Sequence, residues 1–436
     1  MNISTRILYG NSLSQNTPPV NQTGAVVNLT GTHTGKPSVF SVDDVILSKH
    51  TMLIGGTGCG KTTLFYHFVS QLKSKMTDDD VMIIFDSKGD FYSKFYSKND
   101  LVIGNSKQYQ AQSVKWNIYK EVLSDGDSER DFILNTQEIC KSFFEERTQN
   151  TTNAFFPNAA RDLLAAIIIA FIREGKKDHV IKKDFFYNDK LKEFLDLSDA
   201  QMIMDLLADS PDANAILSYI NGDNAQSQGV LSEMYSIIRE ILIGVFAEKG
   251  GFSMREFVRK KGKKILFIEY DLSIGSMLTP VYRLMFDLAL KEALGRNKAQ
   301  GNVYLICDEF KLLPHLRHID DGVNFGRSLG VKVFAGVQSI EQLYEIYGQS
   351  RGRNIAAGFS SVYAFRSNDT ATREYVSGIF GKNIVLERYQ RLDNQIVEEK
   401  RNGQTVEDWD LNSLKVGEAI VGLPFSQPFR FYFDMF

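Results

Sequence analysis

A glycine-rich stretch near the start of the chain has the residue types needed to hold a phosphate group. "LIGGTGCGKTT", residues 53–63, fits the pattern G-x-x-x-x-G-K-[ST] through Gly55, Gly60, Lys61 and Thr62. Such glycines let backbone N–H groups turn inward around phosphate oxygens, and the positive end of the following helix points at them. We therefore expect Lys61 to pair with the β and γ phosphates of a nucleotide, and the Thr62 hydroxyl to bind magnesium.

The segments on either side of this loop favour the same interpretation. "HTMLIGG" is a continuous apolar strand, and "KTTLFYHFVSQLKSKM" has apolar residues at helical spacing. A chance glycine turn is the alternative, and it does not explain this strand–loop–helix order. The residues expected to contact the nucleotide are Gly55, Gly56, Thr57, Gly58, Cys59, Gly60, Lys61, Thr62, Thr63 and, from a second strand, Asp308.

That second strand is "VYLICDEF", which ends in Asp308 and Glu309. We expect Asp308 to hold the magnesium ion together with Thr62, and Glu309 to polarise the water that attacks the γ-phosphate. An Asp-Glu pair after a strand is also a common helix start, so the pair alone leaves both interpretations open. The phosphate loop favours the catalytic one.

Further candidates follow other strands. Gln338 ends "VFAGVQ" and either senses the γ-phosphate or caps the strand, while Arg327 in "NFGRSLG" is a candidate arginine finger for a neighbouring subunit or an ordinary surface arginine. Asp86 and Lys88 in "IIFDSKGDF" also follow a strand, at the edge where open parallel sheets bind ligands. A turn with a solvated lysine explains them equally well.

Composition excludes several classes of protein. The 436 residues are 43% hydrophobic and 24% charged, with a formal net charge of -3, which is typical of a soluble globular protein of two or three domains. This charge argues against a uniformly basic nucleic-acid binder but leaves a local basic channel open. The 3 cysteines are far apart, which argues against a disulfide framework or a zinc site.

Other conspicuous residues have plainer explanations. His315 and His318 lack the partner histidines or cysteines of a metal site. The basic runs at 173–183 and 259–264 are expected to be solvated surface more than phosphate-binding sites. The longest apolar run, residues 163–172, is shorter than the roughly 20 residues that span a bilayer, so we expect a buried helix.

Strands and helices alternate in two parts of the chain, and only helical periodicity occurs between them. The expected fold class is α/β: a RecA-like P-loop NTPase with a mainly parallel β-sheet flanked by helices, plus an inserted all-α domain. The expected divisions are an N-terminal arm or small sheet at 1–45, a nucleotide-binding domain at 46–124 and 249–436, and the all-α domain at 125–248.

The order of these pieces resembles the type IV secretion coupling proteins, ATPases that feed DNA or effector proteins into a conjugation or secretion channel. The stretches that carry the resemblance are "HTMLIGGTGCGKTT", "IIFDSKGDF", "SVKWNIY", "NAFFPNAARDLLAAIIIAFI", "LICDEFKLLPHL", "GRSLGVKVFAGVQSIEQLYEIYG" and "DTATREYVSGIFG". The resemblance implies ATP and Mg²⁺ as ligands and nucleotide roles for Lys61, Thr62, Asp308, Glu309 and Gln338. It also implies a hexameric ring in which Arg327 acts across a subunit boundary.

The resemblance also implies partners and a location. The all-α domain would engage DNA, a relaxosome or effector proteins, and the ring would meet the channel's ATPases and membrane components. Family members usually begin with transmembrane helices, and none is expected in this chain. The chain is therefore expected in the cytoplasm, at the cytoplasmic face of the membrane through a partner or a missing anchor. The active form is expected to be a homohexamer, while a monomer stays open for the isolated chain.

Two other functions remain open on sequence alone. One is a related hexameric DNA translocase or secretion-apparatus ATPase, and the helical insertion argues against a DNA-segregation member of that group. The other is a nucleotide-gated adaptor that docks cargo with little turnover. Glu309 argues against the adaptor, because a switch needs no water-activating carboxylate.

Overall fold

One sheet of 11 strands forms the centre of the computed structural model, which describes residues 2–18, 24–178, 184–211, 213–295, 300–390 and 395–436. From one edge to the other, its strands are β3 (Lys36–Asp43), β2 (Ala25–His33), β14 (Phe429–Phe433), β13 (Glu418–Gly422), β10 (Ser361–Phe365), β4 (Thr51–Ile54), β9 (Val331–Val337), β8 (Val303–Cys307), β5 (Val81–Asp86), β7 (Lys264–Glu269) and β6 (Leu101–Ile103). Strands β10 to β6 are parallel to one another, and β3, β2, β14 and β13 extend the sheet antiparallel.

The parallel strands are buried on both faces. In β5, Val81, Ile83 and Phe85 belong to one hydrophobic core, and Met82 and Ile84 belong to the other. Helices cover both faces, which explains why these strands read as continuous apolar runs in the sequence. The helices α2 (Lys61–Lys75) and α3 (Asp90–Phe95) contribute to one core, and α13 (Met254–Lys260), α14 (Thr279–Leu294) and α15 (Ile319–Phe325) to the other. The expected α/β fold is confirmed.

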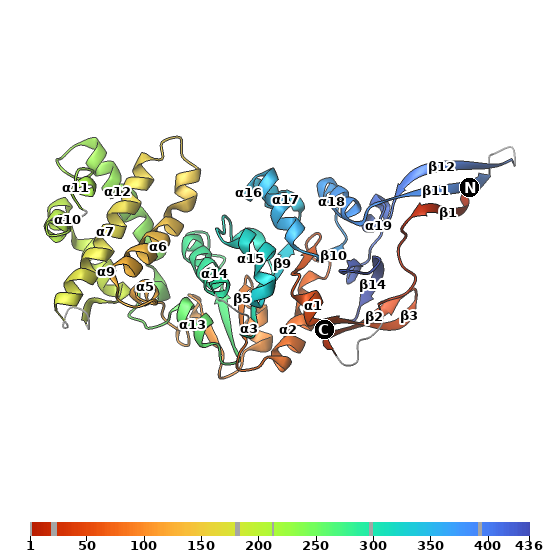
Figure 1. Cartoon of the computed structure of the whole chain (residues 1–436), viewed down its shortest axis with the longest axis horizontal. Helices are drawn as coiled ribbons and strands as arrows, with labels where there is room; N and C mark the ends of the chain where they lie inside the picture. The colour runs from red at the N-terminus through yellow and green to blue at the C-terminus, as the bar shows by residue number, and fades with distance from the viewer. Residues whose placement is uncertain (1, 19–23, 179–183, 212, 296–299, 391–394) are drawn as a thin grey trace.

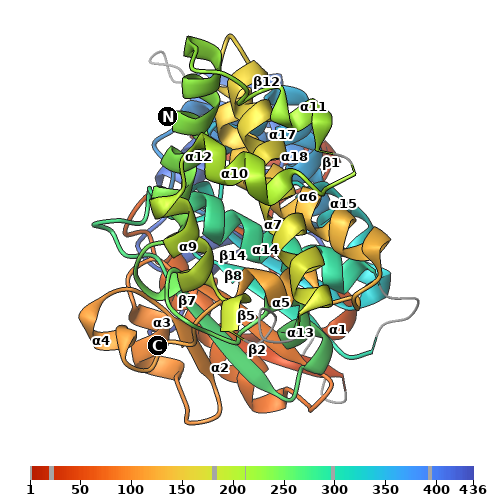
Figure 2. The same ribbon diagram turned by 90° about the vertical axis from the view of Figure 1, so that its left-hand side faces the viewer.

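A group of helices lies at one end of the elongated molecule (Figure 1). It consists of α6 (Glu129–Gln149), α7 (Phe155–Lys177), α9 (Asn188–Leu197), α10 (Ala200–Leu207), α11 (Asn214–Leu217) and α12 (Ala225–Ile241). Figure 2 looks at the molecule from this end and shows these helices in front of the sheet. No strand interrupts them among the residues that the structure describes.

The apolar run at 163–172 lies within α7. Among the described residues, α7 is the one helix long and apolar enough to cross a membrane by length and composition, and 56% of its apolar window is buried inside the protein. It packs against α6 and α12 and contributes Leu163, Ile167 and Ile168 to the core. Within this fold, α7 is a core helix of the helical domain.

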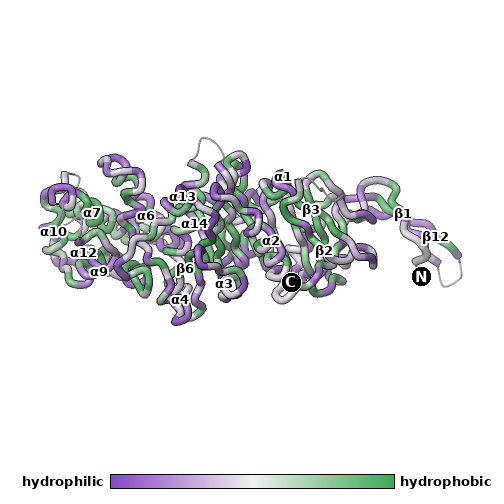
Figure 3. The backbone as a smooth tube through the Cα atoms, turned by 90° about the horizontal axis from the view of Figure 1, so that it is seen from below, coloured by the Kyte–Doolittle hydropathy of each residue, from purple (hydrophilic) through white to green (hydrophobic). Residues whose placement is uncertain are grey.

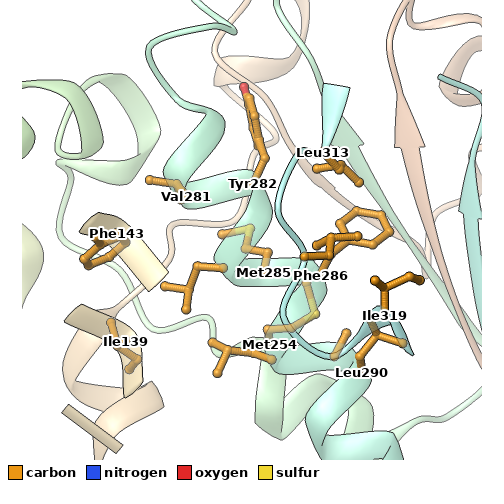
Figure 4. Close-up of a cluster of buried hydrophobic side chains, with 14 of the residues drawn as sticks. Ile139, Phe143, Met254, Val281, Tyr282, Met285, Phe286, Leu290, Leu313 and Ile319 are labelled. Carbon is orange, nitrogen blue, oxygen red and sulfur yellow. The ribbon is translucent and has the colours of Figure 1, made fainter. Parts of the chain in front are cut away.

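The helical domain and the sheet share one core. Figure 4 shows Ile139 and Phe143 of α6 facing Val281 and Met285 of α14, with Met254 nearby. Hydrophobic segments gather along the strands and helices of the interior, and hydrophilic ones lie at the outside (Figure 3). The helical domain is therefore packed on the sheet's own cover helices.

The buried carboxylate of Glu121 connects the two segments through which the chain passes between the sheet and the helical domain. Glu121, in the short helix α5 (Ile118–Val122), is fully buried. It accepts hydrogen bonds from Trp116 Nε1 (3.0 Å), Ser253 Oγ (2.8 Å), Met254 N (2.5 Å) and Arg255 N (3.2 Å). Trp116 and Phe252 also form a parallel β-bridge, so the chain enters and leaves the helical domain at one place.

The N-terminal residues divide between two sheets. Strand β1 (Asn2–Gly10) pairs with β11 (Lys382–Gln390), which pairs with β12 (Ile396–Gln404), and these strands project from the other end of the molecule (Figure 1). Strands β2 and β3 instead join the main sheet beside β14. The remaining short helices are α1 (Asp44–Leu47), α4 (Lys107–Gln110), η1 (Gly244–Phe246), η2 (Phe310–Leu312), η3 (Gly326–Leu329), α16 (Ile340–Tyr347), α17 (Gln349–Gly358), α18 (Thr370–Phe380) and α19 (Asp408–Asn412).

Candidate functional site

The glycine-rich loop connects β4 to α2 at the carboxyl edge of the parallel strands. Its backbone enters the left-handed region at Gly58 (φ 72°) and Gly60 (φ 113°), where a side chain would be strained. Gly60 precedes α2, and no side chain caps the N–H groups at the start of that helix. These N–H groups are therefore available to an anion.

Lys61 lies folded back inside the loop. Its ammonium group donates to the carbonyl oxygens of Gly55 (2.5 Å) and Gly56 (3.0 Å), and Cys59 Sγ lies 4.0 Å away. The side chain is only 8% exposed, so the positive charge is held close to the turn. Phosphate oxygens placed in the loop would replace these carbonyls as acceptors.

Thr62 and Asp308 are in contact although 246 positions separate them in the sequence. The Thr62 hydroxyl donates to the Asp308 carboxylate, with distances of 3.3 Å to Oδ1 and 3.2 Å to Oδ2. Asp308 follows β8 and is 8% exposed. Burial raises the pKa of Asp308 to about 6, and the hydrogen bond from Thr62 and the charge of Lys61 oppose that rise. A hydroxyl and a carboxylate placed together are suitable ligands for Mg²⁺.

Glu309 and Gln338 form the other half of the site. Gln338, at the end of β9, donates from Nε2 to Glu309 Oε2 at 2.6 Å. The second carboxylate oxygen, Oε1, is buried and accepts no hydrogen bond from any residue that the structure describes. A buried carboxylate oxygen without a donor is costly unless water or a ligand fills the place. Gln338 thus holds one oxygen of the Glu309 carboxylate, and the other oxygen can accept a hydrogen bond from water or a ligand.

A pocket of about 250 Å³ brings these groups together. Of the residues expected from the sequence, those that line it are Thr57, Gly58, Gly60, Lys61, Thr62, Thr63, Lys88, Asp308, Glu309 and Gln338. Gly55 is buried at the turn, and Gly56 and Cys59 line a second hollow beside the loop.

Asp86 and Lys88, for which the sequence left two interpretations, have different surroundings. The Asp86 carboxylate is buried and accepts from the backbone N of Tyr92 (2.8 Å) and Lys88 (3.4 Å), so it shapes the turn after β5. Lys88 is exposed and lines the pocket beside Asp308 and Glu309.

Arg327 lies away from these residues. It is exposed in η3, which precedes β9, whereas Gln338 follows the end of β9. A strand of 7 residues spans roughly 20 Å, so Arg327 is at the opposite edge of the sheet from the pocket. Arg327 therefore does not reach the pocket of its own chain.

The C-terminal hairpin is part of the site, and sequence reasoning missed it. Val416, Gly417, Phe433, Asp434 and Met435 line the pocket. Gly417 N donates to the Cys59 carbonyl at 2.9 Å, and a Cβ added at Gly60 would lie 3.0 Å from the Gly417 backbone. The run "GEAIVGLPFSQPFRFYF" forms the antiparallel pair β13–β14, but no motif in it indicates contact with the loop.

The cysteines, histidines and basic residues for which the sequence predicted no site are mostly buried or paired within the fold. Cys59, Cys140 and Cys307 are free and buried. In the run 259–264, Arg259 pairs with Asp125 and Glu292, and Lys260 pairs with Glu256. His318 Nε2 lies 3.3 Å from Glu138, and the ring of His315 packs against Tyr347. Residues 179–183 of the other basic run lie outside the described residues.

Comparison with known proteins adds to this geometry. A family model described as the type IV secretion-system coupling protein DNA-binding domain matches residues 39–408. The curated "Coupling protein TraD" of Escherichia coli (strain K12) is 22% identical over 401 residues, covering 89% of this chain and 52% of TraD. The chain therefore spans about half the length of this curated relative.

Solved structures share the fold. The bacterial conjugative coupling protein TrwBdeltaN70, in an unbound form, matches with a TM-score of 0.74 at 21% identity, covering 95% of this chain and 90% of that one. Plasmid coupling protein TrwB in complex with ADP and Mg²⁺ matches with a TM-score of 0.71 at 19% identity, covering 96% and 95%. VirB4 of Thermoanaerobacter pseudethanolicus matches with a TM-score of 0.54 at 12% identity, covering 96% and 98%.

Proposed function

Because the chain belongs to the family of the type IV secretion-system coupling protein DNA-binding domain, we propose that it is an ATP-hydrolysing coupling protein. In this role it recruits DNA, or a DNA–protein complex, and drives it toward a type IV secretion or conjugation channel. The names of two relatives support the proposal: TraD is named a coupling protein, and TrwB is described as a bacterial conjugative coupling protein.

The nucleotide is proposed to be ATP with Mg²⁺. TrwB has been solved with ADP and Mg²⁺ and with a non-hydrolysable ATP analogue. The groups in this chain fit such a ligand, because the start of α2 has no side-chain cap and Thr62 adjoins Asp308. Bound MgATP would supply the γ-phosphoryl group. Lys61 would then donate hydrogen bonds to phosphate oxygens in place of the carbonyl oxygens of Gly55 and Gly56.

Hydrolysis is assigned to Glu309 and Gln338. The Glu309 carboxylate orients a water molecule through its unsatisfied Oε1 and accepts the proton that the water loses. The hydrogen bond from Gln338 to Oε2 keeps the carboxylate in that orientation. The observation that carries the proposal is that this buried acceptor lines the same pocket as Lys61, Thr62 and Asp308.

The test is an ATPase assay on two variants, with and without single-stranded DNA. Lys61→Ala is expected to abolish both nucleotide binding and hydrolysis. Glu309→Gln is expected to keep MgATP binding and lower kcat by about 10²–10⁴-fold, the usual contribution of a general base. Glu341→Gln is the matched control, because Glu341 is exposed on α16 outside the pocket.

Two results would contradict the proposal. Full hydrolysis by Lys61→Ala would remove the phosphate loop from the mechanism. ATP binding without turnover in the unaltered chain, with DNA present, would instead favour the nucleotide-gated adaptor.

The active assembly is proposed to be a homohexamer with nucleotide between subunits. Support comes from Arg327, an exposed cation remote from its own chain's pocket. In a ring, Arg327 would reach the γ-phosphate bound by the neighbouring subunit and stabilise the charge that develops there. Sedimentation of the chain with and without an ATP analogue would measure the assembly.

The helical domain is proposed to engage the cargo, together with relaxosome or effector proteins, at the cytoplasmic face of the membrane. Support comes from its position at the end of the molecule opposite the projecting strands β1, β11 and β12 (Figure 1). Crosslinking of the helical domain to DNA in the assembled secretion system would test this arrangement.

A further inference from the structure

The turn after β5 places a second lysine in the nucleotide pocket. In the sheet, β5 lies next to β8, so the turn at residues 87–89 adjoins Asp308 and Glu309. Ser87 and Lys88 line the pocket together with these two acids. The glycine-rich loop leaves the sheet from β4, with β9 and β8 between β4 and β5. Lys61 and Lys88 therefore enter the pocket from different sides.

The backbone of this turn is held in place. Asp86 accepts hydrogen bonds from the backbone N of Lys88 (3.4 Å) and of Tyr92 (2.8 Å), and its own carbonyl accepts from Tyr270 N (3.1 Å). Gly89 has a φ of 75°, and an added Cβ would lie 2.4 Å from the Tyr109 hydroxyl. The left-handed backbone at this position favours glycine, so the turn that carries Lys88 has a defined conformation.

The charge of Lys88 is available to a ligand. The side chain is exposed and forms no ion pair with any residue that the structure describes. It is close enough to Asp308 to oppose the burial that raises the pKa of that carboxyl. The pocket holds two acids, Asp308 and Glu309, and a triphosphate would add further negative charge, so a second cation is favourable on electrostatic grounds.

We propose that Lys88 is a second phosphate-binding lysine, which contacts the γ-phosphate on the side away from the glycine-rich loop. This assignment rests on the proposed ATP hydrolysis. In that reaction, the water oxygen bonds to the γ-phosphorus and the bond to the β–γ bridging oxygen breaks. The water proton passes to Glu309, and ADP and inorganic phosphate are the products. The Lys88 ammonium remains protonated and stabilises the charge on the γ-phosphoryl oxygens during transfer.

The experiment compares Lys88→Ala and Lys88→Arg with the unaltered full chain. We expect Lys88→Ala to lower kcat by at least tenfold and to weaken binding of a non-hydrolysable MgATP analogue about fivefold or more, as expected for losing one charge-assisted contact. Binding of MgADP should stay within about twofold of the unaltered chain, because ADP lacks the phosphate that Lys88 contacts. Lys88→Arg should retain part of the lost activity, because the charge is kept.

Lys94→Ala is the matched control. Lys94 is exposed on the next helix, α3, where its ammonium lies over the rings of Tyr66 and Phe436, outside the pocket. Its removal should leave kcat and both affinities unchanged. A general loss of stability would weaken the binding of ADP and of the ATP analogue equally. A selective loss of affinity for the ATP analogue therefore indicates a lost contact with the γ-phosphate and not a folding defect.

Three results would overturn the assignment. They are wild-type kcat in Lys88→Ala, an equal loss of affinity for both nucleotides, and loss of DNA stimulation alone with normal basal turnover. If the unaltered chain hydrolyses no ATP, the proposed function fails, but the comparison of ADP with the ATP analogue still decides whether Lys88 contacts the γ-phosphate.

Discussion

The carboxyl and amino edges of the parallel sheet differ in which candidate functional side chains one chain places there. At the carboxyl edge, Lys61, Thr62, Asp308, Glu309 and Gln338 line one pocket, and hydrogen bonds connect Thr62 to Asp308 and Glu309 to Gln338. At the amino edge, Arg327 is exposed on a short turn with no phosphate loop near it. Under the proposed function, a single chain would hold the groups that bind the nucleotide and activate water, and Arg327 would act on the nucleotide of another subunit.

Among changes outside the pocket, the largest effect is expected at the amino edge. Arg327→Ala should lower kcat by about 10³-fold or more while nucleotide binding is retained, because an arginine finger acts mainly on the transition state. Its unfolding free energy should stay within about 0.5 kcal/mol of the unaltered chain, since the residue is exposed. Steady-state ATPase rates and urea unfolding measure these two quantities.

Mixing variants sharpens this test. An assembly of Arg327→Ala and Glu309→Gln chains should regain part of the activity, because some interfaces then combine an intact Glu309 with an intact Arg327. Failure of every mixture to exceed the two pure variants would contradict action between subunits.

An intermediate effect is expected from Gly336, near the carboxyl end of β9. A Cβ added there would lie 2.0 Å from the backbone carbonyl of Asp308, so Gly336→Ala must push β9 and β8 apart. We expect a loss of about 1–3 kcal/mol in unfolding free energy, the usual cost of overpacking, together with weaker Mg²⁺-dependent nucleotide binding. Urea unfolding with and without nucleotide measures both.

Gly378→Ala is the control for this change. Gly378 lies in α18 with open space around the position of a Cβ, so alanine should be neutral or stabilising there. An unaltered stability in Gly336→Ala would mean that the carboxyl edge is less tightly packed than the structure indicates.

The smallest expected effect is a pH dependence at the same edge. Burial raises the pKa of Asp308 to about 6, so this carboxyl is mainly ionised at pH 7 and mainly protonated at pH 5. Mg²⁺ requires the carboxylate, and nucleotide affinity in the presence of Mg²⁺ should fall about tenfold between these pH values, one pK unit on either side of the pKa. Asp308→Asn should bind weakly at both pH values and remove this dependence.

The contribution of Asp308 to folding has the opposite sign. Because its pKa is higher in the folded protein than its ordinary value, the folded state binds the proton more readily. The unfolding free energy from this group therefore rises as the pH falls through about 6. Binding and stability that fell together on acidification would contradict the role given to this carboxyl.

The sequence was informative where function depends on local pattern. The loop from Gly55 to Thr62 and the strand that ends in Asp308 could be placed because apolar runs, glycines and acids stand next to each other in the chain. The helical character of the insertion could be predicted from periodicity. Since both kinds of signal lie within a few neighbouring residues, no knowledge of distant contacts was needed.

The rest depended on distant pairing. Strand β1 pairs with β11, in which Asn2 and Tyr389 are partners, and both β11 and β12 carry many charged residues that obscure a strand pattern. The contact of Gly417 with the phosphate loop joins residues from opposite ends of the chain. For Lys88, the motif was visible, but its place in the pocket depends on the pairing of β5 with β8, which only the fold shows.

The arrangement at Glu121, where the chain enters and leaves the helical domain, has a consequence for how such proteins evolve. Because Trp116 and Phe252 are bridged where the polypeptide leaves for the helices and returns, the helical insertion begins and ends at one place in the fold. A different helical domain could be inserted there during evolution, or by an engineer, if its inner surface repacked against Val281 and Met285 of α14.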